Sequence, residues 1–283
     1  MGQMDFSKIR VAFQGEPGAF SEAAAVQLLG GEIRTVPRLT FDATFRAIAE
    51  SAADGLLVPV ENTLAGSVVR VYDLLLHSPL EICGETILPI EHHLIGLPGA
   101  KIENLRVVAS HPMALAQCER FFESHPGLKR MPAEDTAGSV REMMERCDAA
   151  AGAIAGRRAA SHYRARILRE NIEDNPENFT RFVLLLPPEE AQRFRAHDAK
   201  KMSIALRLAH RPGALLASLE PFARNGVNLL KIESRPIHGK PFEYQFYIDV
   251  EADRPESLSA ALTEVRAATS QLRVLGLYAA ARR

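Results

Sequence analysis

The chain has 283 residues, of which 47% are hydrophobic and 24% charged, and a formal net charge of −1 at pH 7. This profile is typical of a globular protein, and the length suggests about two domains. The near-neutral charge balance argues against a strongly basic nucleic-acid-binding surface and against an anionic membrane as a partner.

The three cysteines, Cys83, Cys118 and Cys147, are widely and unequally spaced. That spacing fits no zinc or iron–sulfur pattern, and an odd number is a poor disulfide framework. Reduced thiols in a cytoplasmic protein are therefore expected. The N-terminal residues lack the basic segment and apolar run of a signal peptide, and no membrane span is expected.

The first part of the chain predicts alternating strands and helices. Strands are expected at 10–14, 32–36 and 55–60, with helices at 22–29, capped by Ser21, and after Thr40. This order implies a mostly parallel sheet, in which ligands bind beyond the carboxyl ends of the strands. Glu61 and Asn62 follow the third strand and are expected at such an end. They are equally compatible with a plain turn and an exposed carboxylate.

Two turns resemble anion sites because each joins a strand to a helix start. The first is Gly15–Gly18, and the second is Ser110-His111-Pro112 after a strand at 106–109. A plain connection is about as well supported for the first turn, which lacks the glycine fingerprints of nucleotide sites. A helix is also expected to begin at Gly66-Ser67, with Val68, Val71, Leu74 and Leu75 on its inner face.

Extended segments at 80–90 and 92–96 are expected to carry the chain into a second lobe. His92 and His93 are adjacent in one of them, so their side chains point to opposite faces, which disfavours a metal site. The second lobe is built from the strand at 106–109, the helix after Pro112, a helix from Asp135 to Arg146, a strand at 150–155 and a helix at 157–163. The first 185 residues or so therefore predict two α/β lobes that face a cleft.

The stretch Asn178-Phe179-Thr180-Arg181-Phe182 leads into the apolar run 183–186, which ends at Pro187-Pro188. Spacing alone favours a simple strand edge, since Thr is a good strand residue. Residues 188–200 are charged and mixed in composition and are interpreted as a linker. Residues 201–280 then predict the order β-α-β-β-α-β of a ferredoxin-like sensing or dimerising domain.

Several motifs together resemble the prephenate dehydratase family. The matching stretches are Gln14-Gly15-Glu16-Pro17-Gly18-Ala19-Phe20-Ser21, Pro59-Val60-Glu61-Asn62-Thr63, Ser110-His111-Pro112, Leu115-Ala116-Gln117-Cys118, Asp135-Thr136-Ala137 and Thr180-Arg181-Phe182. The C-terminal part resembles the ACT regulatory domain. The resemblance covers nearly the whole chain and keeps the motif order. It implies a two-lobed, periplasmic-binding-protein-like catalytic domain at 8–187, a linker at 188–200 and an ACT domain at 201–280.

The resemblance implies the conversion of prephenate to phenylpyruvate without a cofactor or a metal. It assigns the leaving hydroxyl to Thr180 and substrate binding to Asn62, Ser110 and Gln117. Helix starts near Ser21 and Ser110 would hold the substrate carboxylates. Glu61 would serve as an acid if it is buried. Arg181 is either a substrate ligand or structural, because adjacent strand side chains diverge.

The resemblance also implies allosteric control by L-phenylalanine bound between paired ACT domains, in a homodimer or homotetramer. The residues that match the effector-binding motifs are Gly213, Ala214, Leu215, Leu216, Glu233, Ser234, Arg235 and Pro236. A surface ion pair at a strand end is the simpler interpretation of the second motif.

The sequence departs from the family pattern at Met113, where the family usually has Gln. No chorismate mutase segment is expected before the catalytic part, so the monofunctional form is the nearer match. The stretch Tyr72-Asp73-Leu74-Leu75-Leu76 resembles relatives that act on arogenate. Arogenate dehydratase and a non-catalytic two-lobed amino-acid sensor therefore remain alternatives. An α/β oxidoreductase is disfavoured by the lack of a dinucleotide fingerprint.

Overall fold

The computed structural model describes residues 9–196, 199–237 and 239–281. These residues form two compact units: the first joins the chain up to Val68 with Thr86–Phe182, and the second joins Val69–Glu85 with the chain from Val183 onward. In this division, residues 69–85 pack with the C-terminal part of the chain.

The elements of the first unit come from the start of the chain and again from the part that follows β5 (Glu81–Pro89). They are β1 (Arg10–Gln14), α1 (Phe20–Leu29), β2 (Arg34–Arg38), α2 (Phe41–Ala49), β3 (Gly55–Asn62), β4 (Gly66–Ser67), β6 (His93–Gly96), η2 (Ile102–Asn104), β7 (Val107–Ser110), α4 (Pro112–Ala116), α5 (Glu119–Glu123), β8 (Lys129–Pro132), α6 (Thr136–Arg146), β9 (Ala151–Ala155), α7 (Arg157–His162) and β10 (Arg166–Arg169).

The first lobe confirms the predicted parallel β-α-β-α-β arrangement. β1 pairs in parallel with both β2 and β3, and the strand order is β2-β1-β3-β11, where β11 is Phe179–Leu186. The apolar run of β3 is almost entirely buried, and Thr40 caps α2 by accepting a hydrogen bond from the backbone N–H of Ala43 at 3.1 Å. The carboxyl end of β3 therefore delivers Asn62 to the edge where ligands bind in such sheets.

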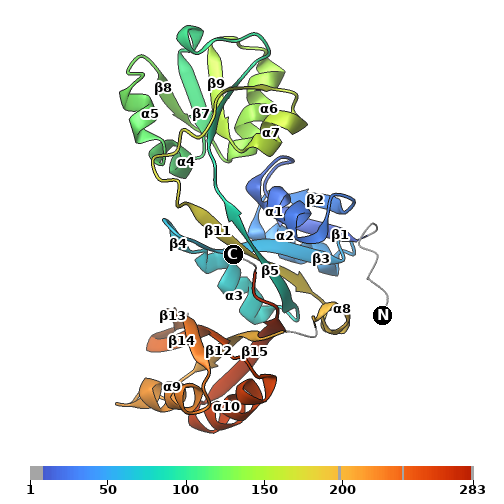
Figure 1. Ribbon diagram of the computed structural model, residues 1–283, viewed down its shortest axis with the longest axis vertical. Helices are drawn as coiled ribbons and strands as arrows, with labels where there is room; N and C mark the ends of the chain where they lie inside the picture. The colour runs from blue at the N-terminus through green and yellow to red at the C-terminus, as the bar shows by residue number, and fades with distance from the viewer. Residues whose placement is uncertain (1–8, 197–198, 238, 282–283) are drawn as a thin grey trace. The chain divides into compact units, whose positions relative to one another are not determined.

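The second lobe has a sheet in the order β10-β6-β9-β7-β8, with helices on both faces (Figure 1). Leu94, Val108 and Ile154 pack with α4 and α5, whereas Ile95 and Ala153 pack with α6 and α7. Neighbouring residues of a strand point to opposite faces of the sheet. Because helices pack on both faces, consecutive residues of these strands are apolar and buried. The helix expected from Asp135 to Arg146 is α6, and Asp135 caps it through a 2.5 Å hydrogen bond from the N–H of Gly138.

The second unit contains the predicted ferredoxin-like order. Its elements are α3 (Val69–His77), most of β5 (Glu81–Pro89), the second half of β11 (Phe179–Leu186), α8 (Pro188–Phe194), β12 (Lys201–Arg207), α9 (Ala214–Arg224), β13 (Asn228–Ile237), β14 (Lys240–Glu251), α10 (Pro255–Ala268) and β15 (Gln271–Tyr278). The antiparallel order is β13-β14-β12-β15, and α9 and α10 cover one core cluster with Ile204, Phe222 and Ile248.

Residues of α3 and β5 complete this unit. Tyr247 donates a hydrogen bond to the carbonyl of Tyr72, and the guanidinium of Arg273 donates to the carbonyls of Leu75 and Leu76 near the end of α3. A cation at this position also complements the helix dipole. Residues of the C-terminal part of the chain therefore hydrogen-bond to α3, the first helix after Asn62 in the sequence.

Several local predictions need correction. Gly66-Ser67 forms the short strand β4 against β3, and α3 begins only at Val69. Ser21 does not cap α1, whose N-cap is Ala19. In the Ser110-His111-Pro112 turn, the N-cap of α4 is His111. Residues 188–194 of the expected linker form α8.

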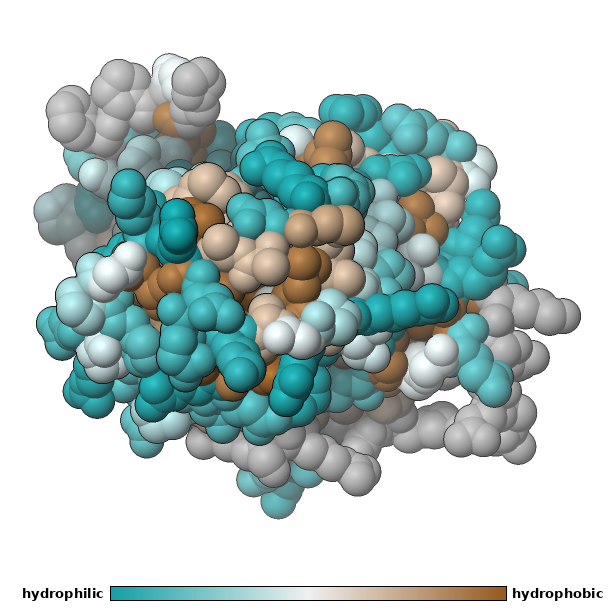
Figure 2. Space-filling model, turned by 90° about the horizontal axis from the view of Figure 1, so that it is seen from above, coloured by the Kyte–Doolittle hydropathy of each residue, from teal (hydrophilic) through white to brown (hydrophobic). Residues whose placement is uncertain are grey.

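None of the described helices is long and apolar enough to cross a membrane. Viewed from the end of the second lobe, hydrophilic residues cover most of the surface, and hydrophobic residues form small patches among them (Figure 2).

Candidate active site

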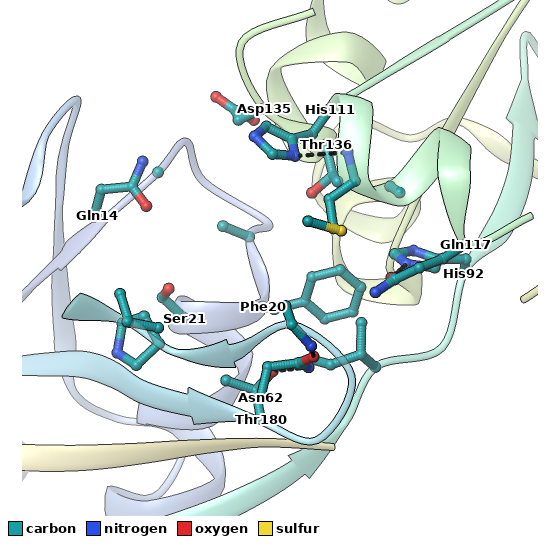
Figure 3. Close-up of a pocket in the computed structure, with 18 of the residues that line it drawn as sticks. Gln14, Phe20, Ser21, Asn62, His92, His111, Gln117, Asp135, Thr136 and Thr180 are labelled. Carbon is teal, nitrogen blue, oxygen red and sulfur yellow. Dashed lines mark hydrogen bonds between the residues drawn. The ribbon is translucent and has the colours of Figure 1, made fainter. Parts of the chain in front are cut away.

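A cavity of about 330 Å³ lies within the first unit and is lined by residues from both lobes. Its size is within the usual range of small-molecule sites. Polar side chains come from the ends of β3 and β11, from the start of α1, and from the loops of the second lobe (Figure 3). Those used below are Ser21, Asn62, His92, Gln117, Asp135 and Thr180, with Phe20 and Met113 among the apolar ones.

Asn62 sets the direction of the Thr180 hydroxyl. The Asn62 Oδ1 accepts hydrogen bonds from the backbone N–H groups of Leu64 (3.0 Å) and Ala65 (2.8 Å). Its Nδ2 therefore faces the other way and donates to Thr180 Oγ1 at 2.9 Å. Because this hydroxyl already accepts a hydrogen bond, its own hydrogen is left to donate elsewhere. Thr180 lines the cavity and is 8% exposed, so a cavity ligand is a natural acceptor.

The second lobe contributes Gln117, which is held from two sides. Its Oε1 lies 2.9 Å from His92 Nε2 and accepts a hydrogen bond from Asn178 Nδ2 at 3.1 Å. Both oxygen lone pairs are therefore used, and the Gln117 Nε2 remains as a double donor. Gln117 lines the cavity, so this donor can serve a carboxylate of a ligand.

His92 is buried, and its ring meets Phe20 edge to face, with ring centroids 5.7 Å apart and an interplanar angle of 79°. Burial lowers the pKa of His92 below its ordinary value, although the hydrogen bond with Gln117 opposes this shift. The imidazole is therefore neutral near pH 7, and its Nε2 carries the hydrogen that Gln117 accepts. The described residues contain no group of His, Cys, Asp and Glu placed to hold a metal ion.

Two longer helices begin at the cavity. Ser21 lies in the first turn of α1, whose N-cap Ala19 offers no side-chain hydrogen bond, so this turn lacks a side-chain cap for its backbone N–H groups. Thr136 opens α6 from the second lobe, beside the capping carboxylate of Asp135. Helix N-termini attract anions, whereas Asp135 adds negative charge at its own terminus. The first turn of α1 also holds an acidic residue, Glu22, but that carboxylate is paired with Arg158, so the α1 start is the better carboxylate cradle.

Glu22 of α1 and Arg158 of α7 form an ion pair between the two lobes. Glu22 is buried and accepts hydrogen bonds from Arg158 (2.8 Å), from the N–H of Gly18 (2.8 Å) and from Thr35 (2.8 Å). Burial by itself raises the pKa of Glu22, but these three donors outweigh it and lower the pKa below the ordinary value. Gly18 has φ +90°, and a Cβ there would lie 2.6 Å from the Cα of Ala159, so only glycine fits this close approach.

Three of the predicted site residues lie outside the cavity lining. Ser110 is fully buried and donates to the carbonyl of Ile154 at 2.6 Å, which joins β7 to β9. Glu61 pairs with Arg181 away from the lining, where Arg181 Nε lies 3.5 Å from Glu61 Oε2. The structure therefore brings together Thr180, Asn62, Gln117 and Ser21, and separates the other three from them. Met113, at the position of the family's usual Gln, lines the cavity and is 48% exposed.

Sequence reasoning assigns no role to His92 or Asn178 in this site. It treats His92 only as half of a metal pair, and Asn178 only as the start of the stretch that contains Thr180. Both make their side-chain contacts across long sequence separations, 25 residues to Gln117 for His92 and 116 residues to Asn62 for Asn178. No local pattern indicates such contacts.

The fold and the cavity define a two-lobed α/β protein with a small-molecule site lined by apolar and polar side chains, joined to a ferredoxin-like domain. The family model described as prephenate dehydratase matches residues 11–190. The chain is also 39% identical, over 289 residues, to arogenate dehydratase/prephenate dehydratase 1, chloroplastic, of Arabidopsis thaliana; the match covers 97% of this chain and 73% of that protein. The chain belongs to the prephenate dehydratase family, whose members are dehydratases of aromatic amino acid biosynthesis.

Two solved structures resemble the whole chain, each with a TM-score of 0.85. One is prephenate dehydratase in complex with L-Phe from Arthrobacter aurescens, which is 30% identical, and the match covers 96% of this chain and 90% of that one. The other is described as GqqA, a novel type of quorum quenching acylases; it is 34% identical, and the match covers 96% and 98% of the two chains.

Proposed function

We propose that this protein is a prephenate dehydratase that converts prephenate to phenylpyruvate, carbon dioxide and water. The observation that carries the proposal is the Thr180 hydroxyl, which accepts from Asn62 Nδ2 at 2.9 Å and so keeps its hydrogen for a ligand in the cavity. A hydroxyl donor at this position suits a reaction in which a ring hydroxyl leaves.

The reaction breaks two bonds of the substrate. The ring carboxylate leaves as carbon dioxide, its electron pair enters the ring, and the C–O bond on the opposite carbon breaks as the ring becomes aromatic. The departing oxygen takes up one proton to become water. Thr180 is too weak an acid to ionise, so we assign it the hydrogen bond that stabilises the departing oxygen, with the net proton coming from solvent.

The other cavity residues bind the substrate in this proposal. Gln117 Nε2 and the N–H groups at Ser21 hold the side-chain carboxylate, while Asn62 acts by orienting Thr180. Ser110 supports the second lobe through its bond to Ile154. The Glu61–Arg181 pair supports β3 and β11 beside the site. Aromatisation supplies the driving force, so the proposed reaction needs no cofactor or metal.

Arogenate is the alternative substrate, because the relative from Arabidopsis thaliana is named for both activities. The test is the turnover of purified protein with each substrate, measured as phenylpyruvate from prephenate and phenylalanine from arogenate. We expect kcat/KM for prephenate to be the higher. A higher value for arogenate would move the assignment to arogenate dehydratase, and no turnover of either would leave a two-lobed sensor as the better account.

The likeness to GqqA raises acylase activity as a second candidate. An acylase that uses a covalent intermediate needs a nucleophile beside a base. Within the described part of the chain, the cavity hydroxyls of Ser21, Thr136 and Thr180 have no hydrogen bond to a histidine or carboxylate side chain. The cavity therefore favours the dehydratase, and an acylase assay on the same preparation tests the second candidate.

We also propose that L-phenylalanine binds the ferredoxin-like domain, acting as an ACT domain, and that two copies of the chain pair there. Gly213 has φ +77° at the start of α9, Leu216 is 73% exposed, and β13 forms the open edge of the described sheet, with Leu230 and Ile232 exposed. The buried Nε of Arg235 has no partner among the described residues and would suit the effector carboxylate. Ala214, Leu215, Glu233, Ser234 and Pro236 complete the proposed motifs.

Phenylalanine is expected to change the prephenate turnover of the wild-type protein at micromolar to low millimolar concentration, because it binds two conformations of the enzyme unequally. The measurement is a titration of the initial rate, with the oligomeric state followed in parallel by light scattering. Turnover that stays constant up to several millimolar phenylalanine would refute the regulatory proposal and leave the catalytic one standing.

A further inference from the structure

We propose that Asn178 is a positioning residue for the dehydratase reaction: it fixes the direction in which Gln117 presents its amide to the substrate and ties that direction to Asn62. Asn178 is 1% exposed and lies behind the cavity wall, outside the residues that line it. This role rests on the proposed function, since turnover is its main readout.

The orientations of the side-chain amides of Asn62, Asn178 and Gln117 all follow from the backbone N–H groups of the turn after Asn62. A backbone N–H can only donate, so the two N–H groups of Leu64 and Ala65 must meet the oxygen of Asn62. The Nδ2 of Asn62 then donates to Asn178 Oδ1 at 2.7 Å. The oxygen of Asn178 is therefore committed to the Asn62 side.

The second end of the Asn178 amide is fixed in turn. Its Nδ2 donates to Gln117 Oε1 at 3.1 Å, so the oxygen of Gln117 is turned toward Asn178. His92 Nε2 meets the same oxygen at 2.9 Å, and the neutral imidazole must donate there. As a result, Gln117 Nε2 is the group left for the cavity, where it can donate to a substrate carboxylate.

Asn178 thereby joins the two lobes of the catalytic unit. Gln117 belongs to the second lobe, and Asn62 and Thr180 belong to the first (Figure 3). The carbonyl of Asn178 also accepts a hydrogen bond from the N–H of Ile90 at 2.8 Å, and this bond fixes the backbone at residue 178. Turning the Asn178 amide around would break bonds to both neighbours, and buried polar groups without partners are costly.

The sharpest variant is Asn178→Asp, which has almost the same shape. The new carboxylate still accepts from Asn62 but cannot donate to Gln117, so Gln117 turns its Nε2 toward residue 178 and its oxygen toward the substrate. Loss of that donor is expected to lower kcat/KM about 100-fold near pH 8. Burial raises the pKa of a carboxyl group, and the carboxyl group that this variant introduces can donate again once it is protonated. The ratio of variant to wild-type kcat/KM is therefore expected to rise as the pH falls.

The pH comparison needs the neighbouring groups to be considered. His92 lies on the other side of Gln117, and Glu173 accepts from the backbone N–H of His92 at 2.8 Å. The Glu173 contact is the same in wild type and variant, so the ratio of the two profiles removes its contribution. His92 does not cancel, because a turned Gln117 presents Nε2 to the ring, and the hydrogen of the neutral imidazole must then move from Nε2 to Nδ1. Protonation of His92 restores a donor toward Gln117 and therefore also raises the ratio as the pH falls. Asn175→Asp is the matched control: Asn175 is exposed in the same loop, and its side-chain oxygen accepts from the N–H of Glu177 at 2.9 Å, as an aspartate would.

Gln117→Glu tests the same directions independently of Asn178. A carboxylate at 117 satisfies both Asn178 and His92, so the melting temperature should stay close to wild type, while the cavity loses its donor and kcat/KM falls about 100-fold. Combining Asn178→Asp with Gln117→Ala should cost no more than Gln117→Ala alone, because Asn178 acts through Gln117.

The outcomes separate this role from the proposed function. A pH-dependent ratio with non-additive losses supports positioning by Asn178. A loss that is independent of pH, additive losses, or Asn178→Asp activity within twofold of wild type overturns it. A Gln117→Glu protein that melts far below wild type also overturns it, and this measurement holds even if the wild-type protein turns over neither prephenate nor arogenate, a result that would refute the proposed function alone.

Discussion

Replacing Thr180 by Val should lower kcat for prephenate by about 100- to 1,000-fold, the usual loss when one donor to a developing negative charge is removed. Valine keeps the size of threonine but cannot donate a hydrogen bond to the departing oxygen. Thr180→Ser keeps the donor, and its kcat should stay within about tenfold of wild type. The measurement is steady-state phenylpyruvate formation at saturating prephenate.

Circular dichroism and melting temperature are the controls for Thr180→Val, since Asn62 Nδ2 loses one of its acceptors in this variant but keeps Asn178 Oδ1 and the carbonyl of Phe179. The variant should therefore fold. If Thr180→Val retains more than about a third of wild-type kcat, the hydroxyl is not the group that stabilises the departing oxygen, and the assignment fails.

The largest effect on stability is expected at Glu85. Its carboxylate is paired with Lys201, at 2.9 and 2.8 Å from Nζ, and the side chains of Lys201 and Glu85 are only 8% and 2% exposed. The backbone N–H of Ala281 donates to the same carboxylate at 2.9 Å. Glu85→Gln leaves the ammonium of Lys201 buried without a counter-charge, which should lower the free energy of unfolding by about 3 kcal/mol or more.

Chemical denaturation of the single and double variants measures this change in the free energy of unfolding. Lys201→Met combined with Glu85→Gln should recover much of the loss, because neither partner is then charged. Glu264→Gln is the control, as the Glu264–Arg224 pair of the same unit is exposed and should contribute less than about 1 kcal/mol. A Glu85→Gln protein as stable as Glu264→Gln would show that the buried Glu85–Lys201 pair does not stabilise the packing of β12 against β5.

The parts of the fold that are predictable have strong local signals. The apolar run of β3, the caps at Thr40 and Asp135, and the helices at 214–224 and 255–268 follow directly from composition and capping chemistry. β8 escapes prediction because all four of its residues, Lys129–Pro132, are exposed and show no alternation. The packing of residues 69–85 with the C-terminal part depends on long-range contacts such as Tyr247 to Tyr72, which the local sequence does not encode.

The site residues also fall into those that the sequence indicates and those that only the structure reveals. The family resemblance points to Thr180, Asn62, Gln117 and Ser21, and the structure places all four at one cavity. It also points to Ser110, whose hydroxyl is instead committed to the carbonyl of Ile154, a bond made across 44 residues. The role of Asn178 cannot be assigned from sequence, because it depends on the direction of two amides that are distant in the chain.

The most direct test of the account is the single-turnover rate of phenylpyruvate formation by Asn62→Asp. Aspartate keeps the oxygen that meets Leu64 and Ala65, but its second oxygen replaces the donor that faces Thr180. Thr180 must then donate to residue 62, away from the substrate. The same oxygen faces Asn178 Oδ1, so the variant also disturbs the Asn178–Gln117 bond. We predict a rate at least as low as that of Thr180→Val, with no further loss when Thr180→Val is added to Asn62→Asp. A folded Asn62→Asp protein with a near-wild-type rate would contradict the account.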